Sequence, residues 1–219
     1  CCPVRTSLKR FLIRTKAEID LLEGWSTVSV RGPAVGATDF ASANPELILP
    51  ADWPGLPGAD LLGPDVTIPA GMLEVSPEVF EAIRIECGVP AMGAELTEKT
   101  IPGEAGAWLI DHSVSFTKGC YTGQELVARV DSRGNNVPRH LRCLVVEGAT
   151  SVSAGSPVVV DGKEVGEVTS AAPTPNDPTG TSSLALAYIG RAVEPPAEGV
   201  VLVEGVEHVV RIEAAPLIG

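Results

Sequence analysis

The sequence contains no apolar run of about 18 residues or more, the length that a membrane-spanning helix needs. Its opening segment, CCPVRTSLKRFLIRTK, is basic and lacks the apolar stretch that signal peptides carry. We therefore expect neither a transmembrane helix nor an uncleaved secretory signal, and no membrane partner. With 16 basic against 28 acidic residues, the net charge of −12 argues against a dedicated binder of nucleic acids or anionic membranes.

Cysteine and histidine are few and irregularly spaced. The five cysteines, at positions 1, 2, 87, 120 and 143, form no CxxC or zinc-finger pattern, and the three histidines show no metal-ligand spacing. An N-x-S/T sequon is absent as well. We therefore predict a reduced, cytoplasmic environment, no disulfide framework and no metal site. Cys87 and Cys143 are interpreted as small buried hydrophobic side chains.

Several well-known catalytic and binding signatures are also missing. The sequence has no GxGxxG, no Walker loop, no HExxH, no GxSxG elbow and no EF-hand loop. These absences argue against dinucleotide binding, P-loop phosphate binding, zincin chemistry and α/β-hydrolase chemistry. The chain begins at Cys1 without an initiator Met, so we expect it to be the downstream part of a longer protein.

Helical signals are clearest in the first half of the chain. Residues 77–87 follow Ser76, a good N-cap, begin with a proline and are closed by a glycine, and Val79, Phe80, Ile83 and Cys87 are predicted to share the buried face. Residues 8–14 are expected to end an earlier helix, and 17–22 and 25–30 to form strands. A further short helix is predicted from Gly123, where Thr122 and Glu125 make a capping box.

From Leu141 onward the pattern changes to short β-rich runs separated by turn residues. Asp161-Gly162 is a strong two-residue hairpin signal within this region. We predict a small antiparallel barrel or sandwich, and an α+β chain divided into domains at 1–136 and 137–219. Residues 118–142 carry five basic against two acidic residues, which suits either an anionic ligand or nucleic acid, or a solvated connector.

The segment Lys118–Glu125, KGCYTGQE, is the densest candidate site. Cys120 lies just before a predicted helix N-terminus and two residues from Lys118, and both neighbours favour the reactive thiolate. The alternative is a buried Cys in a glycine-shaped turn, with Tyr121 packed on the core. The residues alone leave both interpretations open.

This segment matches every position of K-G-C-(F/Y)-x-G-Q-E, the hallmark motif of the YgfZ proteins, and the chain resembles that family over nearly its whole length. The stretch from AIRIECGVP to IPGEAG is similar to the family's R-I-E-A-G-x-P region, and WSTVSVRGP to a strand ending in Q-G-P. YgfZ proteins are folate-binding relatives of the glycine-cleavage T protein. The resemblance implies a T-protein-like folate-binding body followed by a small C-terminal antiparallel β-barrel.

The resemblance also implies a set of site residues. Asp60 of GADLLG stands where the T protein has the Glu that holds the pterin, and Arg84 stands on the following helix, where an Arg assists. Lys118 and Tyr121 of the motif join them as folate-site residues, and Cys120 is the redox-competent thiol. Without the resemblance, Asp60 is read as a turn acid and Arg84 as a cation that complements the helix dipole. The implied cofactor is tetrahydrofolate or a one-carbon derivative.

As implied by the resemblance, the leading function is assembly or repair of iron–sulfur clusters in client enzymes, with Cys120 as the redox or cluster-linked thiol, rather than enzymatic turnover. The alternative is a folate-dependent aminomethyltransferase or another one-carbon transferase. The T protein's catalytic Asp lies upstream of the segment present, so these residues do not establish that activity. A third hypothesis, a hydrolase that pairs Cys120 with His112 or His140, lacks a third orienting group.

The expected partners follow from the same resemblance. They are iron–sulfur scaffold proteins and client proteins, with an indirect link to tRNA modification through one class of client. We expect the protein itself to be a cytoplasmic monomer.

Overall fold

The computed structural model describes residues 3–10, 12, 16–121, 123–132, 134, 136–148, 152–175, 177 and 180–218. The chain forms two compact units, one of Cys1–Ala51 with Gly58–Leu73, the other of Asp52–Pro57 with Glu74–Gly219. Helices and antiparallel sheets both contribute, so the predicted α+β class is confirmed. The predicted division at residue 136 stays a prediction. No helix among the described residues combines the length and the apolarity that crossing a membrane requires.

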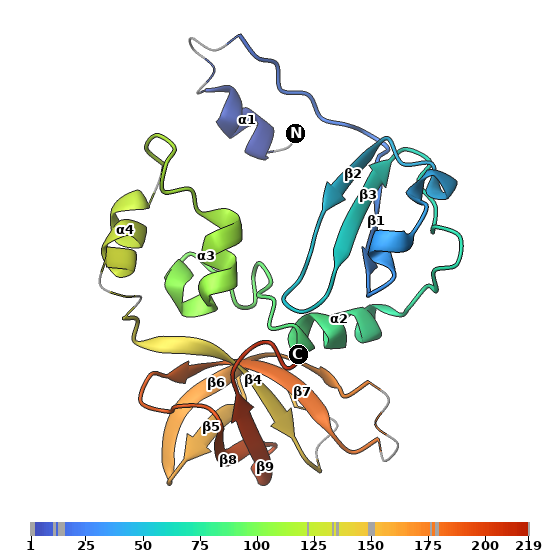
Figure 1. The fold of residues 1–219 in the computed structure, drawn as a ribbon. Coiled ribbons are helices and arrows are strands. Elements are labelled where there is room, and N and C mark those ends of the chain that lie inside the picture. The colour runs from blue at the N-terminus through green and yellow to red at the C-terminus, as the bar shows by residue number, and fades with distance from the viewer. Residues whose placement is uncertain are drawn as a thin grey trace. The chain divides into compact units, whose positions relative to one another are not determined.

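The first unit is built on a three-stranded antiparallel sheet in the order β1-β3-β2 (Figure 1). The strands are β1 (Ser26–Arg31), β2 (Leu47–Pro50) and β3 (Gly58–Gly63). Helix α1 (Pro3–Lys9) and two 3₁₀ turns, η1 (Val35–Ala37) and η2 (Phe40–Ala43), complete the unit. One face of the sheet packs against the 3₁₀ turns and forms a small core of Val30, Val35, Ala43, Ala59 and Leu61.

Two expectations for the start of the chain fare differently. The strand over 25–30 is confirmed as β1, whereas residues 17–22 form no strand, and Leu21 and Leu22 are 51% and 59% exposed. An isolated extended segment without a pairing partner gains no ladder hydrogen bonds, which explains the difference. The expected helix end at 8–14 lies partly outside the described residues, and α1 ends at Lys9.

In the second unit, α2 (Pro77–Glu86) begins as predicted. The Ser76 side chain accepts a hydrogen bond from the Val79 amide, and Cys87 is the C-cap. The predicted buried face is wrong at Val79, which is 38% exposed, because the helix instead packs Ala82 and Ile85 against the barrel. Three shorter helices follow, η3 (Pro102–Ala105), α3 (Ala107–Ser113) and α4 (Gln124–Ser132). Thr122 of the predicted capping box lies outside the described residues.

The C-terminal part is a closed six-stranded antiparallel barrel in the order β4-β7-β6-β5-β8-β9. This resolves the predicted choice between a barrel and a sandwich. The predicted hairpin turn is also confirmed, since Asp161 and Gly162 both have the positive φ of a type I′ turn, 50° and 72°. The strands are β4 (Arg139–Val146), β5 (Pro157–Val160), β6 (Lys163–Pro173), β7 (Ser183–Gly190), β8 (Ala197–Val203) and β9 (Val206–Glu213).

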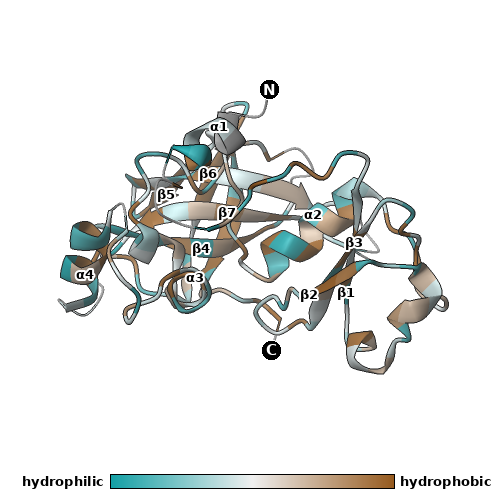
Figure 2. Ribbon diagram, turned by 90° about the horizontal axis from the view of Figure 1, so that it is seen from above, coloured by the Kyte–Doolittle hydropathy of each residue, from teal (hydrophilic) through white to brown (hydrophobic). Residues whose placement is uncertain are grey.

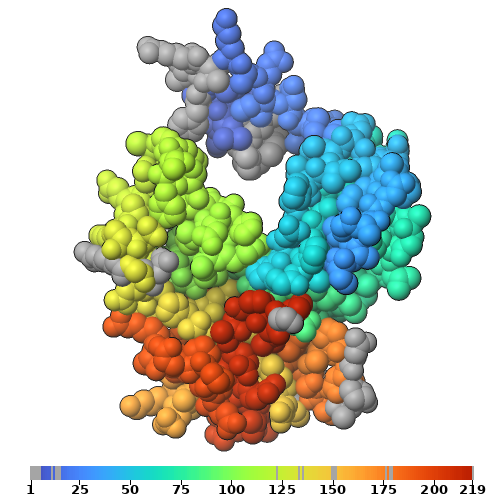
Figure 3. All heavy atoms as spheres, viewed as in Figure 1, coloured from blue at the N-terminus to red at the C-terminus, as the bar shows by residue number. Residues whose placement is uncertain are grey.

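The barrel encloses an apolar core that includes Leu144, Val158, Ile189, Val201 and Ile212, all at most 1% exposed. A second apolar layer outside the barrel joins β4 and β7 to α2. In the hydropathy view the barrel strands carry much of the brown, apolar sequence, whereas α4 shows polar, teal turns (Figure 2). The space-filling view shows the orange and red side chains of the barrel packed into a solid body (Figure 3).

The layer between α2 and the barrel holds two groups whose ionisation the fold opposes. Burial raises the pKa of the Cys143 thiol to about 12 from 9.0, and burial together with the Glu104 charge raises the pKa of Tyr188 to about 12 from 10.0. Both groups therefore stabilise the folded chain fully below pH 9 and lose that contribution as the pH rises toward 12.

We expect the free energy of unfolding to fall between pH 9 and 12. The upper limits of this fall are about 3 kcal/mol from Tyr188, whose pKa rises by two units, and about 4 kcal/mol from Cys143, whose pKa rises by three. Urea unfolding followed at each pH measures this decline. Tyr188→Phe should flatten the part of the curve between pH 10 and 12. A variant curve as steep as the wild-type curve would contradict the assignment to Tyr188.

Candidate functional site

Asp60, the predicted pterin-binding carboxylate, lies in the middle of β3 with its side chain 31% exposed. Its Oδ1 accepts a hydrogen bond from Nη1 of Arg31 at 3.0 Å. Among the described residues, none donates a hydrogen bond to Oδ2. The residue is therefore not the turn acid of the alternative interpretation. It is a strand carboxylate with one oxygen held by a cation and the other available to a ligand.

Arg84, the predicted assisting cation, is almost entirely engaged within the protein. Its Nε and Nη2 donate to the two carboxylate oxygens of Glu81 at 2.8 and 2.6 Å, and its Nη1 donates to the Val89 carbonyl and to Glu95. Burial alone would lower the pKa of Arg84, but the hydrogen bonds to Glu81 and the charge of Glu95 raise it. Among the described residues, none accepts a hydrogen bond from the second N–H of Nη2.

Glu95 is a buried residue that the sequence analysis did not single out. Its side chain is fully buried, yet four donors satisfy it: Thr169 Oγ1 and Ser170 Oγ reach Oε1 at 2.6 and 2.7 Å, while the Ala91 amide and Arg84 Nη1 reach Oε2 at 2.9 and 3.2 Å. A β-bulge in β6 between Val168 and Ser170 lies at this contact. Glu95 thus connects Arg84 of α2 to the barrel. An acid placed before the apolar Leu96 gave no sequence signal for this role.

The motif segment 118–125 presents its cysteine to solvent. Cys120 is exposed, so the alternative of a buried cysteine in a tight turn is not what the structure shows. Lys118 and Tyr121 come together, with the Lys118 ammonium 5.1 Å from the centre of the Tyr121 ring. Gly123, with a φ of 85°, lets the backbone turn into α4. The thiol is therefore carried on a loop shaped by its neighbours rather than packed in the core.

An open hollow of about 680 Å³ lies beside the cysteine. It is large enough for a small ligand or for a few residues of a partner protein. The hollow carries one acid and one cation from α4, so its charge is balanced. Its lining consists of Cys120, Tyr121, Gly123, Gln124, Glu125, Leu126 and Arg129.

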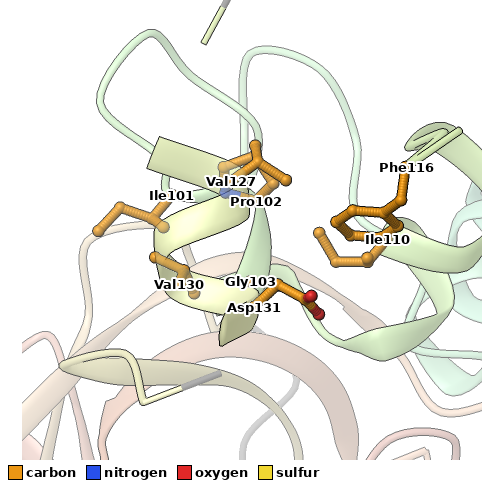
Figure 4. A pocket seen from close by; sticks show the side chains of 8 residues that line it. All are labelled: Ile101, Pro102, Gly103, Ile110, Phe116, Val127, Val130 and Asp131. Carbon is orange, nitrogen blue, oxygen red and sulfur yellow. The ribbon is translucent and has the colours of Figure 1, made fainter. Parts of the chain in front are cut away.

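The opposite side of α4 forms an apolar crevice with α3 and η3 (Figure 4). Its empty space is about 210 Å³, and it is too narrow to hold a water molecule. Val127 is buried there and Phe116 is 53% exposed at the rim. We interpret the crevice as the packing seam that holds α4. It is lined by Ile101, Pro102, Gly103, Ile110, Phe116, Val127, Val130 and Asp131.

The described histidines give no support to a Cys–His pair. His112 Nδ1 lies 2.9 Å from the Trp108 carbonyl, and its ring packs on the Trp108 ring. Burial, with the nearby charge of Arg142, lowers the pKa of His140. Among the described residues, neither histidine forms a hydrogen bond or ring contact with Cys120. In the same part of the chain, no group of three His, Cys, Asp or Glu side chains could hold a metal ion.

Cys87 and Cys143 are both fully buried, as predicted, and the Cys143 thiol donates to the Ile85 carbonyl at 3.4 Å. Of the three cysteines that the structure describes, only Cys120 is exposed. Among these three thiols, Cys120 is therefore the one that a partner or reagent can reach from solvent.

Residues 139–218 match the family model of the glycine cleavage T-protein C-terminal barrel domain. An aminomethyltransferase of Streptomyces avermitilis is 36% identical over 126 residues, which are 57% of this chain and 32% of that protein. The tRNA-modifying protein YgfZ of Hamiltonella defensa is 46% identical over 61 residues, 28% of this chain and 18% of that protein. The chain thus spans at most about a third of the length of these curated relatives.

The glycine cleavage system aminomethyltransferase T of Bartonella henselae has the same fold. Its crystal structure superposes with a TM-score of 0.66 and 16% identity, covering 98% of this chain and 65% of that one. The barrel is therefore a T-protein C-terminal barrel domain. The chain is homologous to aminomethyltransferases and has their fold.

Proposed function

We propose that this chain is part of a folate-binding protein that supports assembly or repair of iron–sulfur clusters in client enzymes. The observation that carries the proposal is the exposed thiol of Cys120 in a segment that matches the YgfZ motif at every position. The similarity to a tRNA-modifying protein YgfZ and to aminomethyltransferases supports it. Scaffold and client partners, the link to tRNA modification, the monomeric state and the cytoplasmic location are parts of the same proposal.

The residues fit a folate in one clear respect. The pterin edge offers an amino group and a ring N–H side by side, and a carboxylate can accept both. Asp60 supplies such a carboxylate, with Oδ2 free of described donors. Arg84, Lys118 and Tyr121 belong to the other unit, and their part in folate binding stays a prediction. A bound folate would supply one-carbon chemistry, while Asp60 would bind and orient its pterin ring.

Cys120 acts on the cluster, which is cargo rather than a resident group. A single thiolate cannot hold an iron–sulfur cluster, so Cys120 supplies one ligand and the partner protein supplies the rest. Alternatively, the Cys120 thiolate attacks a disulfide of the partner, so that a mixed disulfide forms and one partner thiolate is released. Exposure beside the hollow of about 680 Å³ lets a scaffold or client reach the thiol. The buried Cys87 and Cys143 are closed to such a partner.

Titration of the full chain with tetrahydrofolate tests the ligand half of the proposal. We expect saturable binding, weakened about 10- to 100-fold by Asp60→Asn, because hydrogen bonds to a charged acceptor are lost. Asp65→Asn is the matched control, since Asp65 is an exposed acid of the same unit. Equal binding by the Asp60 and Asp65 variants would remove Asp60 from the site, and no binding by the wild type would refute a folate site in this chain.

The alternative is an aminomethyltransferase, favoured by the relatives that carry that name. The two functions differ in their use of Cys120, because aminomethyl transfer needs a group to manage the proton on the reacting folate nitrogen, not a thiol. An assay with an aminomethyl donor and tetrahydrofolate separates them. Turnover that survives Cys120→Ser would favour the transferase.

A further inference from the structure

The outer wall of the barrel carries a row of three valines on β5, β8 and β9. The register places Val159 of β5 opposite Val200 of β8, and Val200 opposite Val209 of β9. Register partners in an antiparallel sheet point to the same face. The residues next to the row in sequence belong to the barrel core, so alternation turns the row outward. These core neighbours are Val158, Val201 and Val210.

Solvent reaches this row although its side chains are apolar. Val209 is 54% exposed, and Val159 and Val200 are half-buried. Leu202, the next outward residue of β8, is half-buried as well. Helix α2 packs on another part of the wall, on β6 and β7. The row and Leu202 therefore form a partly exposed apolar strip on the barrel, which we call the valine strip.

Carboxylates from three strands flank the valine strip. Register and alternation place four exposed glutamates on its face, and the described residues of these strands add one cation to that face, Arg211 of β9. Among the described residues, none of the four glutamates forms an ion pair. The strip is therefore an apolar centre with an acidic surround. The four are Glu164 and Glu167 of β6, Glu198 of β8 and Glu207 of β9.

We propose that the valine strip docks a partner protein through a segment in which lysines or arginines flank apolar side chains. Burial of the apolar centre stabilises the complex, and the glutamates attract the flanking cations. The same charges repel a second copy of this face, a nucleic acid and an anionic membrane. The inference goes beyond the proposed function and does not rest on it, because it uses neither Cys120 nor Asp60.

Titration of the full chain with three short peptides, followed by backbone amide NMR, tests this inference. The first peptide has a Val-Leu-Val centre between Lys-Lys ends, the second a Ser-Ser-Ser centre with the same ends, and the third the apolar centre between Glu-Glu ends. We expect the first to bind at least about 10-fold more tightly than the others, because only it matches both the centre and the surround. Its binding should shift amide signals of β5, β8 and β9 and weaken as salt is added.

Two double variants separate the apolar centre from the charges. Val200→Thr with Val209→Thr should weaken binding of the first peptide about 10-fold, because threonine keeps the β-branched shape but replaces a methyl group by a hydroxyl. Glu198→Gln with Glu207→Gln should weaken it by a similar factor and reduce its salt dependence. The matched controls are an exposed valine at the start of β9 and an exposed acid ahead of the barrel, and neither should change binding. They are Val206→Thr and Glu98→Gln.

Equal binding of the three peptides would overturn the docking site, and so would a valine double variant that binds the first peptide as tightly as the wild type does. If the valine double variant does not fold, the glutamine double variant decides, since wild-type affinity and salt dependence in that variant would also overturn the site. Self-association of the wild-type chain that Val209→Thr abolishes would assign the strip to a second copy instead. Failure of folate binding or of the Cys120 role would leave each of these results unchanged.

Discussion

Cys120→Ser should abolish the contribution of this protein to client-enzyme maturation. The side chain keeps its size but loses the thiolate, and the other two cysteines that the structure describes are fully buried and cannot replace it. Because Cys120 is exposed and makes no recorded packing contact, the fold should be unchanged. The measurement is the activity of a cluster-dependent client enzyme, compared between wild type and variant.

The control for this experiment is Ser113→Ala, an exposed hydroxyl at the end of α3. It should mature the client as well as the wild type does, and both variants should unfold at the wild-type temperature. Full client activity with Cys120→Ser would show that the thiol has no part in the function.

Glu95→Ala should lower the free energy of unfolding by about 3–5 kcal/mol, the usual cost of removing one partner from a buried ion pair. The substitution leaves the Arg84 guanidinium, which is 8% exposed, without one of its two carboxylates. It also removes the acceptor of the Ser170 hydroxyl and one of the two acceptors of the Thr169 hydroxyl, which keeps the Leu186 carbonyl. Chemical denaturation measures the change.

Glu98→Ala is the matched control, because Glu98 is an exposed acid in the same segment and should cost less than about 0.5 kcal/mol. Glu95→Gln keeps the shape of the side chain but not its charge, and should lie between the two. A Glu95→Ala chain as stable as the Glu98→Ala chain would mean that the buried carboxylate does not hold α2 to the barrel.

The sequence predicted those elements whose ends carry capping or turn residues. Helix α2 follows from a serine cap, a first-turn proline and a closing glycine, and the turn at Asp161-Gly162 follows from residues that tolerate a positive φ. Barrel closure could not be read from the strand pattern, because alternation sets the two faces of a strand but not its neighbours in a sheet. Helical spacing likewise did not show which face of α2 meets the barrel, so Val79 was predicted to be buried while Ala82 and Ile85 make the contact.

The candidate site was predicted where its residues are close in sequence. Lys118, Cys120 and Tyr121 belong to one short motif, and the structure brings Lys118 against Tyr121 beside an exposed Cys120. Contacts between distant positions gave no such signal. Arg31 meets Asp60 across 29 positions, and Glu95 meets Ser170 across 75. Only the paired strands and the folded barrel bring these residues together.

In the proposed function, folate binding and the Cys120 thiol serve cluster maturation together. The most direct measurement is the iron and sulfide content of a client enzyme matured with this protein, in the presence and absence of tetrahydrofolate. The expected result is a higher cluster content that needs both the wild-type chain and tetrahydrofolate. Equal cluster content with and without either of them would contradict the claim.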